Sequence, residues 1–249
     1  MSAFSEDPAT AQRNALRGNA DRVKVSGQVL EFEFDELPET GELCFPRLRS
    51  RLKSAAWKSA EKSELALTPD LEEWRVRLEN PPNTSPLTVR VEFLDAPILG
   101  THRIVTTLDQ SQASFVLPAH FAEITGEKLR YEPQPHKNTI GYWTMPMDWA
   151  AWHLKVDVSG NYAVDIYQGC GTGQGGSDVD VVLVQDNQII GRISFQVEDT
   201  EHFQNFKRRR IGTFEIAETG NYDIQIHAKN VAKNAVMDVR QLKLTRTND

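Results

Sequence analysis

The sequence is poor in cysteine, has no long apolar run and has no excess of positive charge. Its two cysteines, Cys44 and Cys170, are too few for a disulfide framework, and we expect free thiols. No segment approaches the roughly 20 consecutive apolar residues that cross a bilayer. The net charge of −7 is spread over both halves of the chain, without the basic excess of nucleic-acid-binding proteins. We therefore expect neither a membrane nor a nucleic acid as a partner.

Signatures of catalysis and of metal binding are missing as well. The six histidines are scattered, with no H-x-x-x-H pair, and no G-x-S-x-G occurs. Gly171–Gly176 matches the G-x-G-x-x-G string, but a strand-like run follows it where a dinucleotide site needs a helix. Around Cys44 a sulfatase-like string has its arginine one position too late, at Arg49. We predict a chain that is not an enzyme and holds no cofactor, and we leave a structural calcium ion open.

What the sequence does contain is a series of short runs in which apolar and polar residues alternate. Such runs occupy residues 23–34, 74–78 and 87–94 in the first half and 152–158 in the second. A period of two is typical of half-buried antiparallel strands, and no segment has the pattern of a long amphipathic helix. The sequence therefore predicts an all-β fold.

The composition changes along the chain indicate three parts. Residues 1–20 lack the apolar core of a signal peptide, and we expect a disordered tail with at most one helical turn. A stretch that contains Pro97 and Gly100 has the character of a boundary. We predict two antiparallel β-sandwich domains, a small one over residues 21–97 and a larger one over residues 103–249.

One strand–turn–strand unit is used twice in the larger predicted domain. Gly160-Asn161-Tyr162 and, sixty residues later, Gly220-Asn221-Tyr222 each follow one alternating run and open the next. Glycine supplies the turn in both places and tyrosine begins the following strand. Two similar hairpins fit two corners of one sandwich.

Three passages of the second half resemble one known kind of module. They are Pro135–Trp152, the glycine-rich loop after Tyr167, and Asn234–Arg240. Together they look like the carbohydrate-binding-type, galactose-binding-like β-sandwich that is appended to secreted glycoside hydrolases and sulfatases, notably bacterial α-L-fucosidase-like proteins. The resemblance covers about residues 112–246 and implies a jelly-roll fold with a glycan ligand.

The first half resembles a second part of the same proteins. Residues 34–43, 48–55 and 89–97 are similar to the small C-terminal β-sandwich of α-L-fucosidases. In that family the sandwich follows a catalytic barrel, and nothing in this chain has the βα repeats of such a barrel. The resemblance implies an accessory region without its catalytic domain.

Aromatic residues are the first candidates for ligand contacts. Sugars pack their apolar C–H faces on aromatic rings, while their hydroxyls bind amides and carboxylates. Trp143 and Trp149 stand in turn-rich sequence beside Asp148, and we interpret all three as glycan contacts, with burial in the core as the competing interpretation. Trp152 opens an alternating run and is expected in the core.

Two further places are suggested by the resemblance. Phe203, Gln204 and Asn205 belong to a loop that carries an aromatic platform in the modules that this chain resembles. Asp238 precedes the last strand, where such modules often place a polar residue that contacts the ligand. A buried hydrogen-bonding role for Asp238 is the competing interpretation.

The basic run Lys207–Arg210 has two interpretations. It is either a solvated strand edge that guards against aggregation or a contact for an anionic glycan, for instance a sulfated one. Alternation along a strand would place only two of the four side chains on one face.

These observations predict a non-catalytic module that binds a neutral or anionic glycan, or that docks a glycoside hydrolase on carbohydrate. Two alternatives stay open. The chain is a detached C-terminal fragment of an α-L-fucosidase or sulfatase, or it is a purely structural sandwich that packs on a partner enzyme. An exposed apolar face on residues 21–97 would favour the structural role. We expect an extracytoplasmic location if the chain is part of a larger secreted protein, and a cytoplasmic one otherwise.

Overall fold

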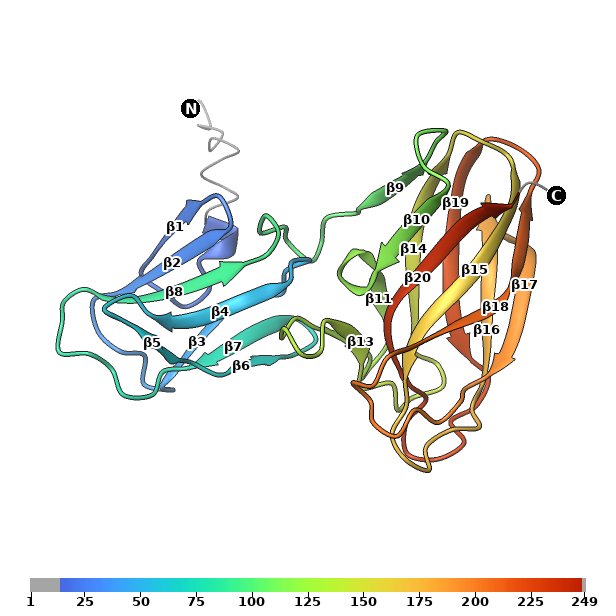
Figure 1. Cartoon of the computed structure of the whole chain (residues 1–249). Helices are drawn as coiled ribbons and strands as arrows, with labels where there is room; N and C mark the ends of the chain where they lie inside the picture. Colours follow the sequence, from blue (N-terminus) through green and yellow to red (C-terminus); the bar gives the residue numbers. More distant parts are fainter. Residues whose placement is uncertain (1–13, 248–249) are drawn as a thin grey trace, which may run out of the picture. The chain divides into compact units, whose positions relative to one another are not determined.

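The computed structural model describes residues 14–247 and divides the chain into two compact units (Figure 1). The first unit runs to His102 and includes Pro133–Pro135, and the second comprises Arg103–Glu132 and the residues from His136 onward. Twenty β-strands dominate the described residues, beside a helical turn at residues 14–16 and the 3-10 turn η1 (Ala119–Phe121). The all-β prediction is confirmed. That the units fold as independent domains stays a prediction.

The first unit is a sandwich of a five-stranded and a three-stranded sheet. The larger sheet has the order β1 (Arg22–Ser26), β2 (Val29–Phe34), β8 (Leu87–Phe93), β4 (Leu52–Trp57), β5 (Ala60–Glu64), and the smaller one β3 (Glu42–Pro46), β7 (Glu73–Arg77), β6 (Leu67–Pro69). In β2, β3, β7 and β8 the alternating sequence places one side of the strand in the core between the sheets. Phe32 and Phe93 of the larger sheet meet Phe45 and Trp74 of the smaller one, with ring centroids 4.9 to 6.3 Å apart. Aromatic contacts of this kind fix how the two sheets pack.

Ion pairs link strands of the five-stranded sheet on its polar face. Lys58 binds Glu31 and Lys53 binds Glu92, both at 2.8 Å. The large hydrophobic side chains that are exposed in the described part of this unit are only Val25, Leu37 and Leu94. The apolar face that would favour a purely structural role is therefore not found among these residues.

Residues 14–20 differ from the expectation of a disordered tail, because they pack on the first unit. Leu16 and Ala20 are fully buried, and the Asn19 side chain donates to the Glu42 carbonyl and accepts from the Cys44 amide at 2.9 and 2.8 Å. The polar composition of this segment suggested disorder, but its few apolar side chains are buried against the first unit. Residues 1–13 of the predicted tail lie outside the described residues.

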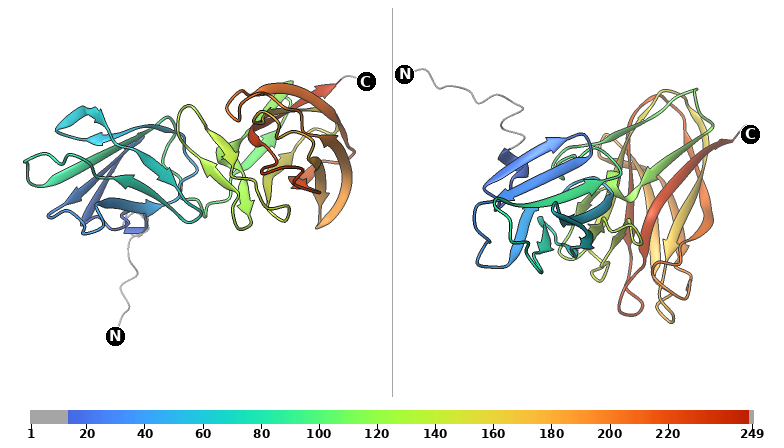
Figure 2. Two further views of the ribbon diagram at one scale, coloured as in Figure 1. Left: turned by 90° about the horizontal axis from the view of Figure 1, so that it is seen from below. Right: turned by 60° about the vertical axis from the view of Figure 1, so that its left-hand side comes forward.

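The second unit consists of two larger sheets. One has the order β12 (Arg130–Glu132), β13 (Thr139–Gly141), β20 (Asp238–Thr247), β15 (Gly160–Gly169), β18 (Lys207–Ile216), with β10 (Ser114–Pro118) also on β20. The other has the order β11 (Glu123–Thr125), β14 (Trp149–Val156), β19 (Gly220–Ala228), β16 (Asp178–Gln185), β17 (Gln188–Gln196), with β9 (Val105–Leu108) parallel to β14. Figure 1 shows the long strands of the two sheets side by side, and the left view of Figure 2 is toward their ends. Trp152 is buried between the sheets, as expected.

The two Gly-Asn-Tyr hairpins have the same local structure. The Tyr162 hydroxyl donates to the Val158 carbonyl at 2.6 Å, and the Tyr222 hydroxyl donates to the Glu218 carbonyl at 2.7 Å. The glycine that ends each turn and begins the next strand has a positive φ, which residues with a Cβ seldom adopt. The repeated sequence unit therefore forms the same turn, closed by a tyrosine hydroxyl, before β15 and before β19.

The basic run forms the beginning of β18, an edge strand, and its side chains alternate as predicted. Arg208 and Arg210 both bind Asp165 of β15, at 2.7 and 2.6 Å, whereas Arg209 pairs with Glu198. Burial alone would raise the pKa of Asp165, but the hydrogen bonds from Arg210 and Arg208 outweigh it and lower that pKa. Two of the four charges are thus already paired with a buried carboxylate, which favours the strand-edge interpretation.

Candidate functional site

Two of the expected glycan contacts are inside the second unit. Trp143 and Asp148 are each only 1% exposed, and the Trp143 indole donates to the Asp148 carbonyl at 3.0 Å. The Asp148 carboxylate accepts the backbone N–H groups of residues 127–129 at 2.8 to 2.9 Å. A carboxylate with three such donors stabilises a turn. The prediction that Trp143 and Asp148 contact a ligand is wrong, because neither side chain reaches the surface.

Trp149 is half-buried and lies apart from the other candidates. It is the first residue of β14, and its ring stacks on His227 of β19, with centroids 5.2 Å apart. Burial lowers the pKa of His227, so a neutral imidazole faces the indole. The pair belongs to the sheet that does not contain Asp238.

The loop between β17 and β18 is held close to the end of β15 by two glycines. A Cβ atom at Gly169 would collide with the Phe203 carbonyl oxygen, and one at Gly171 would lie 2.7 Å from the Phe203 ring. The Asn205 amide donates to the Thr200 carbonyl at 2.7 Å, which closes the loop on itself. Phe203 and Gln204 are half-buried and Asn205 is exposed. The glycine-rich loop, for which we excluded a dinucleotide site, leads into the strand β16 and serves this packing.

Two of the nominated residues, Gln204 and Asp238, lie together, and two residues that we had not nominated join them. The Gln204 side chain is hydrogen-bonded to the Asp238 carboxyl. Glu132, at the end of β12, faces the same point, because a Cβ atom at Gly141 would collide with Glu132 Oε2 and lie 3.0 Å from Asp238 Oδ1. The Lys137 ammonium pairs with Glu132. Glycine at position 141 therefore provides the space in which the two carboxyl groups converge.

Burial determines the electrostatics of this pair. Asp238 is 6% exposed and Glu132 is 3% exposed. Burial raises the pKa of Asp238, the negative charge of Glu132 adds to the effect, and Lys137 and Gln204 oppose it, which together bring that pKa to about 8. Asp238 therefore holds its proton at neutral pH and can donate a hydrogen bond.

Tyr142 presents an aromatic ring at the surface beside these groups. Its φ is +58°, unusual for a bulky residue, and the residue is 45% exposed. The Arg130 guanidinium lies 3.6 Å from the ring centroid and the Lys137 ammonium 5.7 Å from it. We use the name Tyr142 cluster for the set of Glu132, Lys137, Tyr142, Gln204 and Asp238.

Arg240 braces the Tyr142 cluster from the other side. Its guanidinium donates to the carbonyls of His136 and Lys137 at 3.2 and 2.8 Å and lies 3.9 Å from the centroid of the Phe206 ring. Burial lowers the pKa of Arg240. The backbone of Lys137 is therefore fixed by Arg240, and its side chain is fixed by Glu132.

The arrangement can bind but is poorly suited to catalysis. Tyr142, Lys137 and Gln204 retain exposed surface, whereas Glu132 and Asp238 are covered. A glycosidase acid and base must reach the scissile bond, and these two carboxyl groups can only position the residues above them. Among residues 14–247, no group of three or more His, Cys, Asp or Glu side chains is placed to hold a metal ion. In the same residues no helix has the length and apolar character of a membrane crossing.

Sequence reasoning missed Glu132, Lys137 and the role of Tyr142 for identifiable reasons. Glu132 and Lys137 are five residues apart around a proline-containing turn, a spacing that could have suggested a cross-hairpin ion pair. Nothing in the sequence indicated the positive φ of Tyr142, since neither glycine nor asparagine occupies the position.

The comparisons with known proteins give structural likeness alone. No family model matches the sequence, and no curated protein matches it. The C-terminal family 6 carbohydrate-binding module of a marine laminarinase from Zobellia galactanivorans is similar with a TM-score of 0.41 and 15% identity, over 53% of this chain and 99% of that one. A family 35 carbohydrate-binding module from Clostridium thermocellum gives 0.42 and 16%, over 55% and 100% of the two chains. An α-L-fucosidase from Vibrio sp. strain EJY3 gives 0.36 and 12%, over 94% of this chain but only 41% of the enzyme.

Proposed function

We propose that the second unit is a non-catalytic glycan-binding module whose ligand contacts the Tyr142 cluster. The observation that carries the proposal is the exposed Tyr142 ring beside Lys137 and Gln204, whose polar groups are each held by a buried carboxyl group. A ring for the apolar face of a sugar and fixed donors for its hydroxyls are what such a site requires. Phe203 and Asn205 border the cluster through the same loop.

The roles of the five residues follow from their exposure. Tyr142 would pack on the ring of the sugar, and Lys137 and Gln204 would bind hydroxyl groups. Glu132 and Asp238 are positioning residues, because they are buried and act through Lys137 and Gln204. A shallow site of this kind buries little area, so we expect weak binding for a single site.

An array of immobilised neutral and sulfated glycans tests the proposal. The unmodified protein should bind at least one glycan, and Tyr142→Gly and Gln204→Ala should each weaken that binding about tenfold or more. Trp149→Ala is the matched control, since it removes an aromatic ring from the other sheet. Unchanged binding in both cluster variants would contradict the proposed site. Binding to no glycan would contradict the proposed function.

Docking of a glycoside hydrolase on carbohydrate is the finer part of the proposal. It rests on the resemblance of both halves to regions that accompany fucosidase catalytic domains. The alternative of a detached hydrolase fragment makes the same prediction for this chain, namely glycan binding without turnover. Hydrolysis of aryl-fucosides or aryl-sulfates by the purified protein at enzyme-like rates would contradict both.

A further inference from the structure

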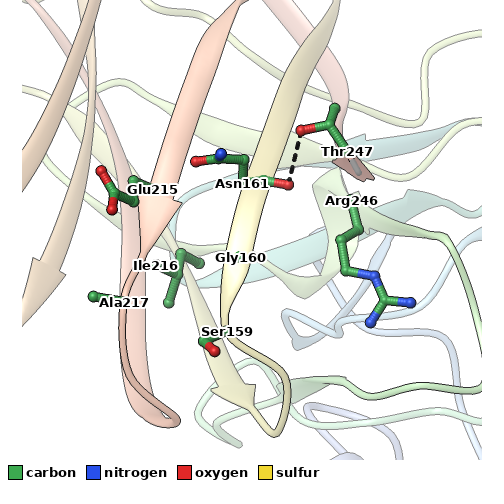
Figure 3. Close-up of a pocket in the computed structure, with 8 residues that line it drawn as sticks. All are labelled: Ser159, Gly160, Asn161, Glu215, Ile216, Ala217, Arg246 and Thr247. Atoms are coloured by element: carbon green, nitrogen blue, oxygen red, sulfur yellow. Dashed lines mark hydrogen bonds between the residues drawn. The ribbon is translucent and has the colours of Figure 1, made fainter. Parts of the chain in front are cut away.

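An open groove crosses the ends of the two Gly-Asn-Tyr hairpins of the second unit. Its first part, about 360 Å³, is lined by Asn161 and Arg246 among others (Figure 3). Its second part, about 640 Å³, lies between β17 and β18 and is lined by Arg192 and Phe214. Glu215 and Ala217 line both parts, so the two parts adjoin each other. Their volumes are in the range of pockets that hold small ligands.

The groove is far from the Tyr142 cluster. Gly160 and Thr247 line the groove, whereas Gly169 and Asp238, at the other ends of β15 and β20, border the cluster. Each of these strands has ten residues, and a strand rises about 3.3 Å per residue, or roughly 30 Å in all. The groove therefore requires a function of its own.

Three polar side chains of the groove have no hydrogen-bond or ion-pair partner within residues 14–247. The Asn161 amide, the Glu215 carboxylate and the Arg246 guanidinium make no hydrogen bond or ion pair with any other residue of the described range 14–247. Figure 3 shows the Asn161 amide on the Glu215 side of β15 and the Arg246 guanidinium on the other side. The one hydrogen bond drawn there joins the Thr247 hydroxyl to the backbone carbonyl of Asn161. These side chains are free to bind a ligand.

The close approach of the two edge strands disfavours an inserted peptide strand. A Cβ atom at Gly191 of β17 would lie 3.0 Å from the Phe214 ring, and one at Gly212 of β18 would lie 3.0 Å from Ile193. Two glycines thus bring β17 and β18 together with no space for a further strand between the sheets. A ligand must instead lie along the surface and bind through side chains.

The charges of the groove favour a neutral ligand. Its lining contains two carboxylates, Glu215 and Glu218, and two guanidinium groups, Arg192 and Arg246. Arg192 is also paired with Asp180. Planar amide, carboxylate and guanidinium groups without a net charge suit hydroxyl groups better than an anion or a cation.

From these observations we propose that the groove is a second glycan site, for a chain of neutral sugars that runs across the ends of the two hairpins. In this site the side chains of Asn161, Glu215 and Arg246 bind hydroxyl groups of the sugars. The site goes beyond the proposed function, because it shares no residue with the Tyr142 cluster.

Amide chemical shifts of the ¹⁵N-labelled protein, titrated separately with cellohexaose, mannohexaose and maltohexaose, test this proposal. At least one hexasaccharide should shift the amides of residues 159–161 and 213–218. Glu215→Gln should raise the Kd of that hexasaccharide about tenfold, since one charge-assisted hydrogen bond is weakened. Glu127→Gln, the same substitution at an exposed site outside the groove, should leave the Kd unchanged. Absence of shifts in the groove with all three sugars, or an unchanged Kd in Glu215→Gln, overturns the proposal.

The same titration separates the two sites. Tyr142→Gly should leave the shifts of the groove intact. If the sugars shift only the amides around Tyr142, the groove proposal fails and the proposed function stands. If they shift only the amides of the groove, the assignment of the Tyr142 cluster fails and the groove proposal stands. Shifts in the groove by tetralysine or tetraglutamate, but by none of the sugars, would assign it to a peptide partner and overturn the glycan class.

Discussion

Tyr142 combines an exposed ring with a backbone φ of +58°, a conformation that costs a residue with a side chain about 1–2 kcal/mol relative to the usual regions. Such strain persists only where the surroundings determine it, and it is common at binding sites. Arg130 stacked on the ring and Thr144, whose amide donates to the Tyr142 carbonyl at 2.9 Å, hold the residue in place. Glycine tolerates this φ, so Tyr142→Gly removes the ring without disturbing the backbone.

Trp143, the next residue, should affect stability and not binding. Trp143→Ala removes a fully buried indole and its hydrogen bond to the Asp148 carbonyl, and we expect a loss of about 3–5 kcal/mol in the free energy of unfolding. Trp149→Ala, at a half-buried ring, should cost less than about 2 kcal/mol. Urea unfolding of both variants measures the difference. Equal costs would contradict the contrast in burial between the two rings.

Asp238 should make the stability of the protein depend on pH in a direction unusual for a carboxyl group. Its folded pKa of about 8 lies above its ordinary value of 3.8. Between these pH values the unfolded chain is ionised while the folded one keeps the proton, so the free energy of unfolding falls as the pH rises from about 4 to 8. Asp238→Asn stays neutral and should be more stable than the unmodified protein at pH 9, on the order of a few kcal/mol.

Urea unfolding at pH 5, 7 and 9 compares Asp238→Asn with the unmodified protein. The advantage of the variant should grow with pH and reach its full value at pH 9. An advantage that is constant across the three pH values would show that Asp238 is ionised throughout.

At the scale of strands and loops, Gly169 at the end of β15 packs against the loop that carries Gln204. Gly169→Ala places a methyl group against the Phe203 carbonyl oxygen, so the loop must move away from Asp238. We expect weaker glycan binding together with lower thermal stability. Gly173→Ala is the control in the same region, because nothing lies within 4 Å of its Cβ position and only its positive φ costs about 1 kcal/mol. Equal melting temperatures for the two variants would contradict the packing described here.

The strands were predictable from the sequence because their alternation is strong, and the proposed binding site was predictable only in part. The runs at 74–78 and 87–94 became β7 and β8, since burial on one face leaves a period of two in the residues. Trp143 and Trp149 carry no such pattern, because turn-rich sequence around a tryptophan accompanies a buried ring as readily as an exposed one. The convergence of Glu132 and Asp238 depends on strands more than one hundred residues apart in sequence, which no local pattern can indicate.

At the scale of the whole molecule, both proposed glycan sites belong to the second unit. The residues of the Tyr142 cluster and of the groove all lie between Arg103 and Thr247. We therefore expect the fragment 103–249 to fold and to bind glycans with a Kd within about threefold of that of the full chain, which corresponds to less than about 1 kcal/mol. The fragment 1–102 should bind none of them. Loss of binding in a folded 103–249 fragment would contradict the assignment of the sites to one unit.

The most direct test of the central claim is the Kd of the tightest array-positive glycan, measured by calorimetry for the unmodified protein and for Tyr142→Gly. Melting temperatures of both proteins show that each is folded. Our account predicts that Tyr142→Gly is at least as stable as the unmodified protein and binds the glycan about tenfold or more weakly. An unchanged Kd in the folded variant would contradict it.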